Sequence, residues 1–591
     1  MTKIKYLDGK RFYNAFAAGG ESIINNRAYL NKINVFPVAD SDTGTNLATT
    51  IHSILNEAKP SASLPTTVRS ISDSALIGAR GNSGIIFAQY LVGLSLELEE
   101  TSRVSIQKFA LSAQQAVNHV YDSLADPVEG TILTVMREWA EALNLHSQKN
   151  SDFCTVLKAA YSSAEAALLD TPNQLSILKK SGVVDAGAQG FVNFLEGIIK
   201  FISEGNLRET SIISSLPIVE SIKNEHNLAD ANFRYCAEAI LSNSKLNLAD
   251  FKQKFRDYGD SLIVAGSQRK MHVHIHTDQP DKFFYETKDF ATIDQIKIDD
   301  MHQQYQVSHK RKYALGIVTD SGCDLPTEFF EKYQIQQISF GINFGDNIFL
   351  DNKTLKSEQF YQMLRTEKVH PVSSQPSPKV LQNMYDLMSD NFERTYSVHM
   401  SKELSGLYNT TEKIAQDFSN ITPVNSKHLS VSQGLIVLRL ARAIEAGKTA
   451  AEIDQLLPQW IEKSHILTDV QTLKYLVRGG RISPLKGFVA KVLNLKPIVT
   501  VDANGKGAAV DKSFSRRQSF SKICAKLQKI AANHEIWEYA IVHAEAPERA
   551  EMYAEKLSQL FQKKPAYIMP ISPVIGVHNG IGAVGIGVMT K

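Results

Sequence analysis

The spacing of apolar residues changes twice along this 591-residue chain, and each change indicates a different kind of fold. Up to about residue 205, apolar residues recur at i, i+3 and i+4, which is the pattern of amphipathic helices. Between about 206 and 310 they alternate with polar residues, as in strands that bury one face. From about 312 to 591, short apolar runs alternate with helical segments, which is typical of α/β layers. We therefore expect a multidomain chain with an all-α antiparallel helical bundle, a small α+β middle domain and an α/β domain.

These periods also locate the elements. The first part is expected to be helical throughout, with examples at Arg11–Leu30, Leu47–Glu57, Gly84–Glu99, Ser105–Leu124, Thr131–Leu143, Asp152–Leu169 and Gly190–Glu204. Three strands are expected in the middle part, at Arg234–Leu241, Ser261–Gly266 and Met271–Thr277. The last part has expected strands at Tyr313–Val318, Gln337–Asn343, Thr395–His399, Tyr539–His543 and Ala566–Pro570, with helices such as Glu403–Phe418 and Leu435–Ala446 between them.

Charge and cysteine usage narrow the class of protein. Lys and Arg number 64 and Asp and Glu number 62, so the net charge of +2 argues against non-specific binding of nucleic acid. The four cysteines lie far apart without a CxxC pair, which indicates a reducing cytoplasm. The most apolar segment, 84–96, is well short of the ~20 residues that span a bilayer, so we expect no transmembrane segment.

Two carboxylates stand on a predicted loop that precedes a helix. Asp40 and Asp42 are two residues apart, so in an extended loop their side chains point the same way and suit a hard cation. Asn34 could add an amide oxygen, and Thr43 lies at the start of the helix. The alternative interpretation is an ordinary turn with a helix cap, because Asp, Thr, Gly and Asn are common turn residues.

Three more polar loops lie at predicted helix starts. The segment 78–84 is rich in glycine and enters an apolar helix, so its backbone N–H groups could hold phosphate. The segments 127–131 and 184–190 are further polar turns, each at the start of a helix. Four such loops between amphipathic helices predict a nucleotide–magnesium site at the mouth of a bundle.

Four strings from these loops resemble, in order and spacing, the ATP-binding domain of fatty acid kinases: NVFPVADSDTGTN, GARGNSGII, PVEGTILTV and GVVDAGAQG. That domain is similar to the L-type domain of dihydroxyacetone kinases, and the resemblance covers about residues 8–205. It implies two Mg²⁺ ions held by Asp40, Asp42 and Asn34, with Thr43 beside them. It also implies that ATP is bound by a larger set: Asn46, Gly81, Asn82, Ser83, Gly84, Thr131, Asp185 and Gly187.

The middle part contains a cysteine and histidine constellation. His272, His274 and His276 alternate along one predicted strand, so their imidazoles share a face, and Cys236 lies on another strand. Such a set suits zinc, but a polar sheet edge beside a buried thiol gives the same pattern. The strings RYCAEAIL, GDSLIVAG, HVHIHTD and IKIDDM resemble the middle domain of fatty acid kinases over residues 206–310. The resemblance implies Cys236, His274 and His276 as Zn²⁺ ligands and leaves His272 unassigned.

Polar clusters in the last part follow predicted strands, which is where open α/β sheets bind ligands. A hydrolase triad of serine, His578 and Asp320 is not favoured, because these clusters contain no G-x-S-x-G elbow. The strings GIVTDSGCDLP, SSQPSP, SKELSGLY, YLVRGGRIS and SPVIGVHNGIGAVGIG resemble the DegV family of fatty-acid-binding proteins over residues 312–591. The resemblance implies a two-lobed α/β domain that buries one acyl chain. Its carboxylate would be held by Ser321, Ser373, Ser405 and His578, with Arg481 on the surface that docks the kinase.

Together these resemblances predict a fatty acid kinase fused to its acyl carrier, which transfers the ATP γ-phosphate to a fatty-acid carboxylate. The carboxylate is already ionised at neutral pH and needs no general base. The resemblance also implies a homodimer and a downstream acyltransferase that uses the acyl phosphate. Two alternatives stay open from the residues alone: a dihydroxyacetone-type (glycerone) kinase and a non-catalytic lipid-binding regulatory protein.

Overall fold

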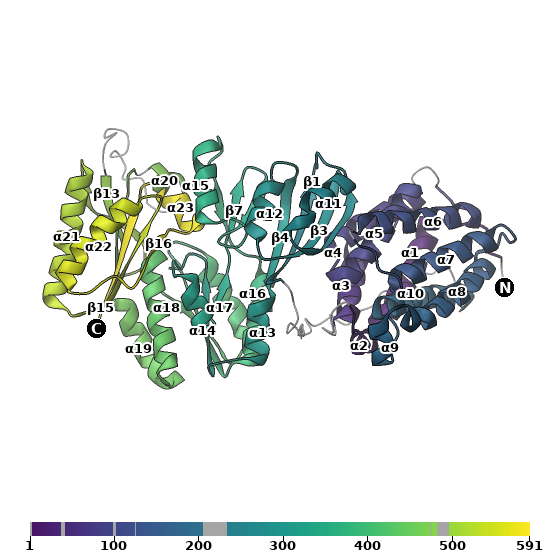
Figure 1. Ribbon diagram of the computed structural model, residues 1–591, viewed down its shortest axis with the longest axis horizontal. Helices are drawn as coiled ribbons and strands as arrows, with labels where there is room; N and C mark the ends of the chain where they lie inside the picture. The colour runs from purple at the N-terminus through teal and green to yellow at the C-terminus, as the bar shows by residue number, and fades with distance from the viewer. Residues whose placement is uncertain are drawn as a thin grey trace. The chain divides into compact units, whose positions relative to one another are not determined.

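The computed structural model describes residues 3–36, 42–98, 102–124, 126–204, 233–472, 474–480 and 496–591. It divides into two compact units. Unit 1 comprises Met1–Gln279 and Asp289–Tyr305, and unit 2 comprises Pro280–Lys288 and Gln306–Lys591. The expected sequence of an all-helical part, a small α+β part and a large α/β part is confirmed (Figure 1). Among the described helices, none combines the length and apolar character that crossing a bilayer requires.

The helical part of unit 1 packs around a single apolar core. Side-chain oxygens of Asp8, Ser105 and Asp152 cap the starts of three of its helices, which fixes where those helices begin. The elements are α1 (Gly9–Asn25), α2 (Arg27–Lys32), α3 (Thr43–Glu57), α4 (Leu64–Gly78), α5 (Gly81–Glu97), α6 (Ile106–Ser123), α7 (Ile132–Ser147), α8 (Phe153–Gln174), α9 (Ser176–Ser181) and α10 (Ala186–Glu204).

The middle part is an antiparallel four-stranded sheet with strand order β2-β3-β1-β4. Its strands are β1 (Tyr235–Ser242), β2 (Asp260–Ser267), β3 (Lys270–Thr277) and β4 (Thr292–Asp300). The accompanying helices are α11 (Leu248–Phe255), the short turn η2 (Arg256–Tyr258), α12 (Pro280–Thr287) and α13 (Met301–His309).

The sheet is docked directly on the helical bundle. Helix α5 is buried along most of its length, and its one long polar buried side chain, Gln89, donates to His119 O at 3.2 Å and accepts from Gly266 N–H at 2.6 Å. On β3, His272 Nδ1 lies 2.8 Å from Leu76 O. Burial lowers the pKa of His272 to about 4, so the neutral ring donates its Nδ1–H to that carbonyl. The sheet therefore presents one fixed face to the bundle.

Unit 2 contains three sheets. A parallel sheet has the order β11-β10-β5-β6, an antiparallel one has the order β8-β7-β9, and a mixed one has the order β14-β13-β12-β17-β15-β16. Helix α18 contacts both larger sheets.

The strands are β5 (Leu315–Asp320), β6 (Gln336–Ile338), β7 (Gly341–Phe344), β8 (Asn347–Leu350), β9 (Val372–Ser374), β10 (Arg394–His399), β11 (Ile421–Asn425), β12 (Ser464–Asp469), β13 (Lys496–Val501), β14 (Gly507–Ser513), β15 (Ile536–His543), β16 (Ile568–Pro570) and β17 (Val584–Thr590). The helices are α14 (Thr327–Tyr333), α15 (Ser357–Thr366), α16 (Pro378–Asn391), α17 (Leu407–Ile414), the short turn η3 (Ala415–Asp417), α18 (Ser430–Glu445), α19 (Ala450–Glu462), α20 (Lys474–Arg478), α21 (Arg516–Asn533), α22 (Pro547–Phe561) and α23 (Pro573–Asn579).

Two of the predicted elements are wrong in detail. The single helix Arg11–Leu30 is two helices, because Asn26 leaves the helical conformation and its amide donates to Ser22 O at 2.9 Å. The single strand Gln337–Asn343 is two strands, β6 and β7, which belong to different sheets.

Candidate functional site

The start of α3 carries the acidic loop. Asp42 is the N-cap residue, and its carbonyl accepts Asn46 N–H at 2.8 Å, but its carboxylate forms no capping bond. Thr43 and the preceding Asn34 are buried. Asp40 lies outside the described residues. The carboxylate of Asp42 is therefore not used to cap α3.

The glycine-rich loop packs against this helix start. Gly81 begins α5 with a φ of +57°, and a β-carbon at this position would lie 2.3 Å from Asn46 Nδ2. A β-carbon on Gly84 would lie 2.5 Å from the Thr50 hydroxyl. Glycine is thus needed for α5 to begin so close to α3. The side-chain oxygen of Asn82 is buried and has no hydrogen-bond partner among the described residues, so a ligand donor would satisfy it.

Asp185 joins the two remaining helix starts. Its Oδ1 accepts Ala188 N–H at 2.8 Å in the first turn of α10, and the backbones of Ile132, which begins α7, and Gly187 also hydrogen-bond this carboxylate. Burial raises the pKa of Asp185 to about 6, and these N–H groups oppose that shift. A β-carbon on Gly187 would lie 3.3 Å from the Ser83 hydroxyl, so α10 also begins next to the glycine-rich loop.

Thr131 is held at the start of α7 by its neighbours. Its hydroxyl accepts Leu133 N–H at 3.3 Å, which makes it the N-cap. Glu129, two residues earlier, accepts Arg137 Nη1–H at 2.7 Å and the Tyr121 hydroxyl at 2.8 Å. This network anchors the loop in front of the helix.

The four predicted loops are thus the starts of α3, α5, α7 and α10, and the contacts above join them at one end of the bundle. Helix starts carry unpaired N–H groups and a partial positive charge, so they attract anions. A group of four helix starts suits a polyphosphate better than it suits a single small anion.

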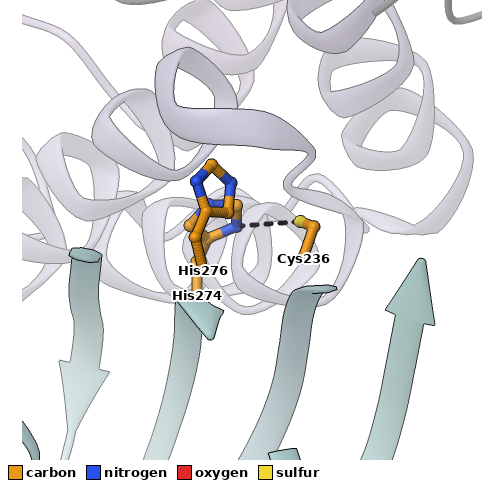
Figure 2. Close-up of side chains that lie close together, drawn as sticks. All are labelled: Cys236, His274 and His276. Carbon is orange, nitrogen blue, oxygen red and sulfur yellow. Dashed lines mark hydrogen bonds between the residues drawn. The ribbon is translucent and has the colours of Figure 1, made fainter. Parts of the chain in front are cut away.

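Cys236, His274 and His276 form a cluster in the middle sheet (Figure 2). Cys236 pairs with His276 across β1 and β3, and one ligand-capable atom of each residue lies within 4.8 Å of the others. Cys236 Sγ is 3.9 Å from His274 Nδ1. His274 Nε2 is buried and has no hydrogen-bond partner among the described residues. A thiol and two imidazoles are the donor set that zinc prefers, and an unsatisfied ring nitrogen fits a missing metal bond.

Charged residues surround this cluster. Glu238 lies opposite Lys297 across β1 and β4, and Asp299 lies opposite Cys236. Burial raises the pKa of the Cys236 thiol well above its usual value, and Glu238 adds to the effect. Burial disfavours ionisation of Glu238, but Lys297 and His274 outweigh it and hold its pKa well below the usual range. The sequence motifs did not reveal Glu238 and Lys297, although their alternation with Cys236 and Asp299 along the strands places them on the same face.

The cluster lies on the face of the sheet that packs on the helical bundle. Asp42 is close enough to Cys236 to contribute to the raised pKa of its thiol. Ile263 and Ala265, on the same sheet, lie within the apolar core of the bundle. The face of the sheet that holds the cluster therefore lies against the helical bundle.

A second polar site lies in unit 2. Ser373 Oγ on β9 is 3.3 Å from His578 Nε2, at the end of α23. Gly479 packs on the other side of the ring, because a β-carbon there would lie 2.0 Å from His578 Nδ1. Ser405 lies in the loop before α17, and the adjacent Gly406 contacts Gln375, close in sequence to Ser373. Arg481 lies outside the described residues.

Two of the polar residues predicted in this half have internal partners. Ser321 is fully buried, and its hydroxyl accepts Phe340 N–H at 3.0 Å. Asp320 contacts His399, with its Oδ2 3.2 Å from Nδ1, and His399 Nε2 is 2.7 Å from Ser397 Oγ. This Asp–His–Ser set is fully buried, so it braces β5 against β10 and offers no hydrolase site.

Two buried carboxylates hold α23, which carries His578. Asp324 Oδ1 accepts Ser572 N–H at 2.9 Å, and Asp351 Oδ1 accepts Val574 N–H at 3.2 Å. The Ser430 hydroxyl also donates to Asp324, at 2.5 Å. Hydrogen-bond acceptors at the start of a helix stabilise that helix, whether they are charged or neutral. The two carboxylates therefore fix the position of α23, which ends next to His578.

The buried Asp324 predicts a pH effect on the stability of unit 2. Burial raises its pKa from 3.8 to about 6, and the Ser430 and Ser572 hydrogen bonds oppose that shift. Because the folded pKa exceeds the unfolded one, this group's stabilisation is fully present below about pH 4 and is lost as pH rises through 6. We expect the unfolding free energy of wild type minus that of Asp324→Asn to fall by about 2 to 3 kcal/mol between pH 4 and pH 7.5. Calorimetry of both full-length proteins measures this difference; a constant or rising difference would contradict the assignment.

Three family models match the chain in succession. The DAK2 domain model matches residues 37–200, the model of the FakA-like middle domain of fatty acid kinases matches 232–308, and the DegV family model matches 314–591. The chain therefore combines a DAK2 domain, a FakA-like middle domain and a DegV domain.

Individual proteins with similar sequences match about half of the chain. Protein YloV of Bacillus subtilis is 30% identical over 314 residues, which are 51% of this chain and 57% of that protein. The uncharacterized protein SH1689 of Staphylococcus haemolyticus is 32% identical over 322 residues, 52% of this chain and 58% of that protein. The match thus spans somewhat more than half the length of these relatives. Among solved structures, DegV, a fatty acid binding protein from Bacillus subtilis, is 27% identical with a TM-score of 0.44, covering 47% of this chain and 100% of that one.

Proposed function

We propose that this chain is a fatty acid kinase that carries its own acyl carrier. Unit 1 binds ATP, and the DegV domain holds a fatty acid whose carboxylate accepts the γ-phosphate. A carboxylate oxygen forms a bond to the γ-phosphorus, the bond to the bridging oxygen of ADP breaks, and acyl phosphate and ADP result. The observation that carries this proposal is the succession of DAK2, fatty acid kinase-like and DegV domains in one chain.

The ATP site is the group of converging helix starts in unit 1. Their N–H groups bind the phosphates, the buried side-chain oxygen of Asn82 accepts from a donor group of the ligand, and Ser83, Thr131 and Asp185 shape the surrounding loops. Asp40 and Asp42, with Asn34, hold two Mg²⁺ ions, which supply charge neutralisation to the phosphates when bound. Because the transferred phosphoryl group needs mainly positioning and electrostatic stabilisation, this residue set suits the chemistry.

The Cys236, His274 and His276 cluster binds one Zn²⁺ ion next to the acidic loop. The donor set and the unsatisfied His274 Nε2 support this assignment. When bound, the ion would supply Lewis acidity on the face of the sheet that packs on the helical bundle.

The zinc assignment predicts a change in metal content. We expect about one Zn²⁺ per chain in the purified protein and less than about a tenth of that in Cys236→Ser, because the remaining two imidazoles bind zinc far more weakly. Plasma emission spectrometry measures it, with Cys154→Ser, the other half-buried cysteine of unit 1, as the matched control. Unchanged zinc in Cys236→Ser would reject the ligand set.

The carboxylate of the fatty acid lies at the Ser373–His578 pair, with Ser405 nearby. Hydroxyl and imidazole N–H donors suit an ionised carboxylate, and no base is required because there is no proton to remove. The acyl phosphate is a reactive mixed anhydride, so an acyl-transferring enzyme must consume it.

ATP consumption that depends on added fatty acid tests the function. We expect ADP to form in proportion to added fatty acid, together with acyl phosphate detected by phosphorus NMR. Phosphorylation of dihydroxyacetone instead would favour the glycerone-type kinase, and lipid binding without ATP turnover would favour a regulatory protein.

A further inference from the structure

The Cys236 cluster is flanked by a carboxylate that has no place in the ligand set. Glu238 is two residues after Cys236 on β1 and lies directly opposite His274 on β3, so all three side chains share one face of the sheet. Glu238 Oε1 is 3.5 Å from His274 Nδ1. The other ring nitrogen of His274, Nε2, is the buried atom without a hydrogen-bond partner among the described residues.

We propose that Glu238 is a positioning residue for the metal centre. Its carboxylate contacts Nδ1 of His274 at 3.5 Å, the ring nitrogen that also faces Cys236 Sγ at 3.9 Å. Glu238 thereby holds the imidazole in one orientation beside Cys236. This inference rests on the proposed zinc site and deepens it by assigning the support of one ligand.

The burial of Glu238 is the first argument for this role. The residue is only 5% exposed, and a buried carboxylate is costly unless hydrogen bonds and opposite charges compensate. A residue that merely paired with Lys297 could do so at the surface. Instead its Oε1 faces the imidazole, and its Oε2 faces Lys297 at 3.8 Å.

Lys297 completes the arrangement from the neighbouring strand. Its Nζ is 2.5 Å from Asp299 Oδ2, and Asp299 lies opposite Cys236 across β1 and β4. The lysine therefore lies between two carboxylates and places a positive charge beside Glu238 Oε2, which accepts no hydrogen bond among the described residues. A carboxylate held on one side by lysine and on the other by a ligand histidine resembles the outer shell that tunes many zinc sites.

A second explanation is a purely structural ion pair between β1 and β4. The two explanations differ in what they predict for the metal. A structural pair would affect the stability of the sheet, whereas a positioning residue changes metal affinity and the ligand field while the fold stays intact.

The test uses the full chain and the metals alone. Glu238→Gln keeps the size of the side chain but replaces the anionic acceptor, and we expect its Zn²⁺ affinity, measured by chelator competition, to fall about 10- to 100-fold. With Co²⁺ in place of Zn²⁺, the visible d–d bands should shift, because the imidazole is no longer held in one orientation. Lys297→Gln should shift both readouts in the same direction by a smaller factor.

The control is Asp294→Asn, which removes a carboxylate from the same strand as Lys297 but at the Ser242 end of the sheet. It should leave Zn²⁺ affinity and the Co²⁺ spectrum unchanged. Circular dichroism melting shows whether each variant is folded. If Glu238→Gln does not fold, Lys297→Gln still tests the proposal. Equal affinity and equal spectra for folded Glu238→Gln and wild type would overturn the positioning role while leaving the zinc site intact. A wild-type chain that binds neither metal would overturn both.

Discussion

Replacing Asp42 by asparagine is expected to lower the rate of acyl-phosphate formation by about 100-fold or more while the protein remains folded. Asp42 stands at the start of α3, which packs against the start of α5. Its neutral analogue leaves magnesium and phosphate charge uncompensated in the transition state, and removing one such electrostatic contact commonly costs two to three orders of magnitude. Coupled-enzyme detection of ADP with saturating fatty acid measures the rate. Asp40→Asn should behave in the same way.

Asp73→Asn is the matched control, since Asp73 is an exposed carboxylate on α4 of the same bundle. It should retain the wild-type rate. Calorimetric titration should show weaker Mg–ATP binding by Asp42→Asn, and circular dichroism should show the same melting transition as wild type. If Asp40→Asn and Asp42→Asn both keep more than about a tenth of the wild-type rate, the metal assignment is wrong.

The four polar loops at helix starts could be located from the sequence because their signals are local. Glycine at a positive φ and a threonine N-cap are properties of a few consecutive residues, and Gly81 and Thr131 have these conformations in the structure. The alternation in HVHIHTD likewise predicts that His274 and His276 share a face, which the strand register confirms. The roles assigned to these residues remain predictions.

Elements whose packing depends on distant residues were harder to predict. Helix α4 was missed because its buried face includes Thr67, Ser72 and Ser74, which look like loop residues. Their hydroxyls donate to carbonyls of the preceding turn, such as Ser74 Oγ to Ser70 O at 2.8 Å, so they can be buried without other partners. The apolar residues Leu64, Val68, Ile71 and Ala75 do recur at i, i+4, i+7 and i+11, so the sequence contains a helical pattern that the hydroxyl residues between them obscure.

Strands β6 and β7 were merged for a related reason. Ser321, at the end of β5, donates its N–H to Ile338 O at 2.9 Å and accepts Phe340 N–H on its hydroxyl. These bonds end β6 and redirect the chain into another sheet. The partner is some 20 residues away in sequence, so the apolar run alone cannot reveal the break. The same bonds occupy the Ser321 hydroxyl that was predicted to hold a fatty acid.

The proposed fusion of a carrier with a kinase predicts the behaviour of two full-length variants. Asp42→Asn has an intact DegV domain but a defective ATP site, whereas the double variant Ser373→Ala/Ser405→Ala has an intact ATP site but cannot hold the carboxylate. Each should be nearly inactive alone. The acyl chain gains about 0.8 kcal/mol for each buried CH₂, so wild type and Asp42→Asn should retain bound fatty acid through purification, visible by native mass spectrometry. The double variant should lose it.

Mixing the two variants separates transfer within a chain from transfer between chains. If the covalent link delivers the fatty acid, it provides an effective concentration that reaches millimolar, and a mixture at micromolar concentration should recover only a small fraction of the wild-type rate. The recovered rate should then rise with the concentration of either variant. Full recovery of the wild-type rate at micromolar concentration would show that one chain can deliver fatty acid to the ATP site of another. The covalent link would then be unnecessary for delivery. A double variant that is fully active alone would mean that Ser373 and Ser405 do not hold the substrate, because the carboxylate could then be phosphorylated without them.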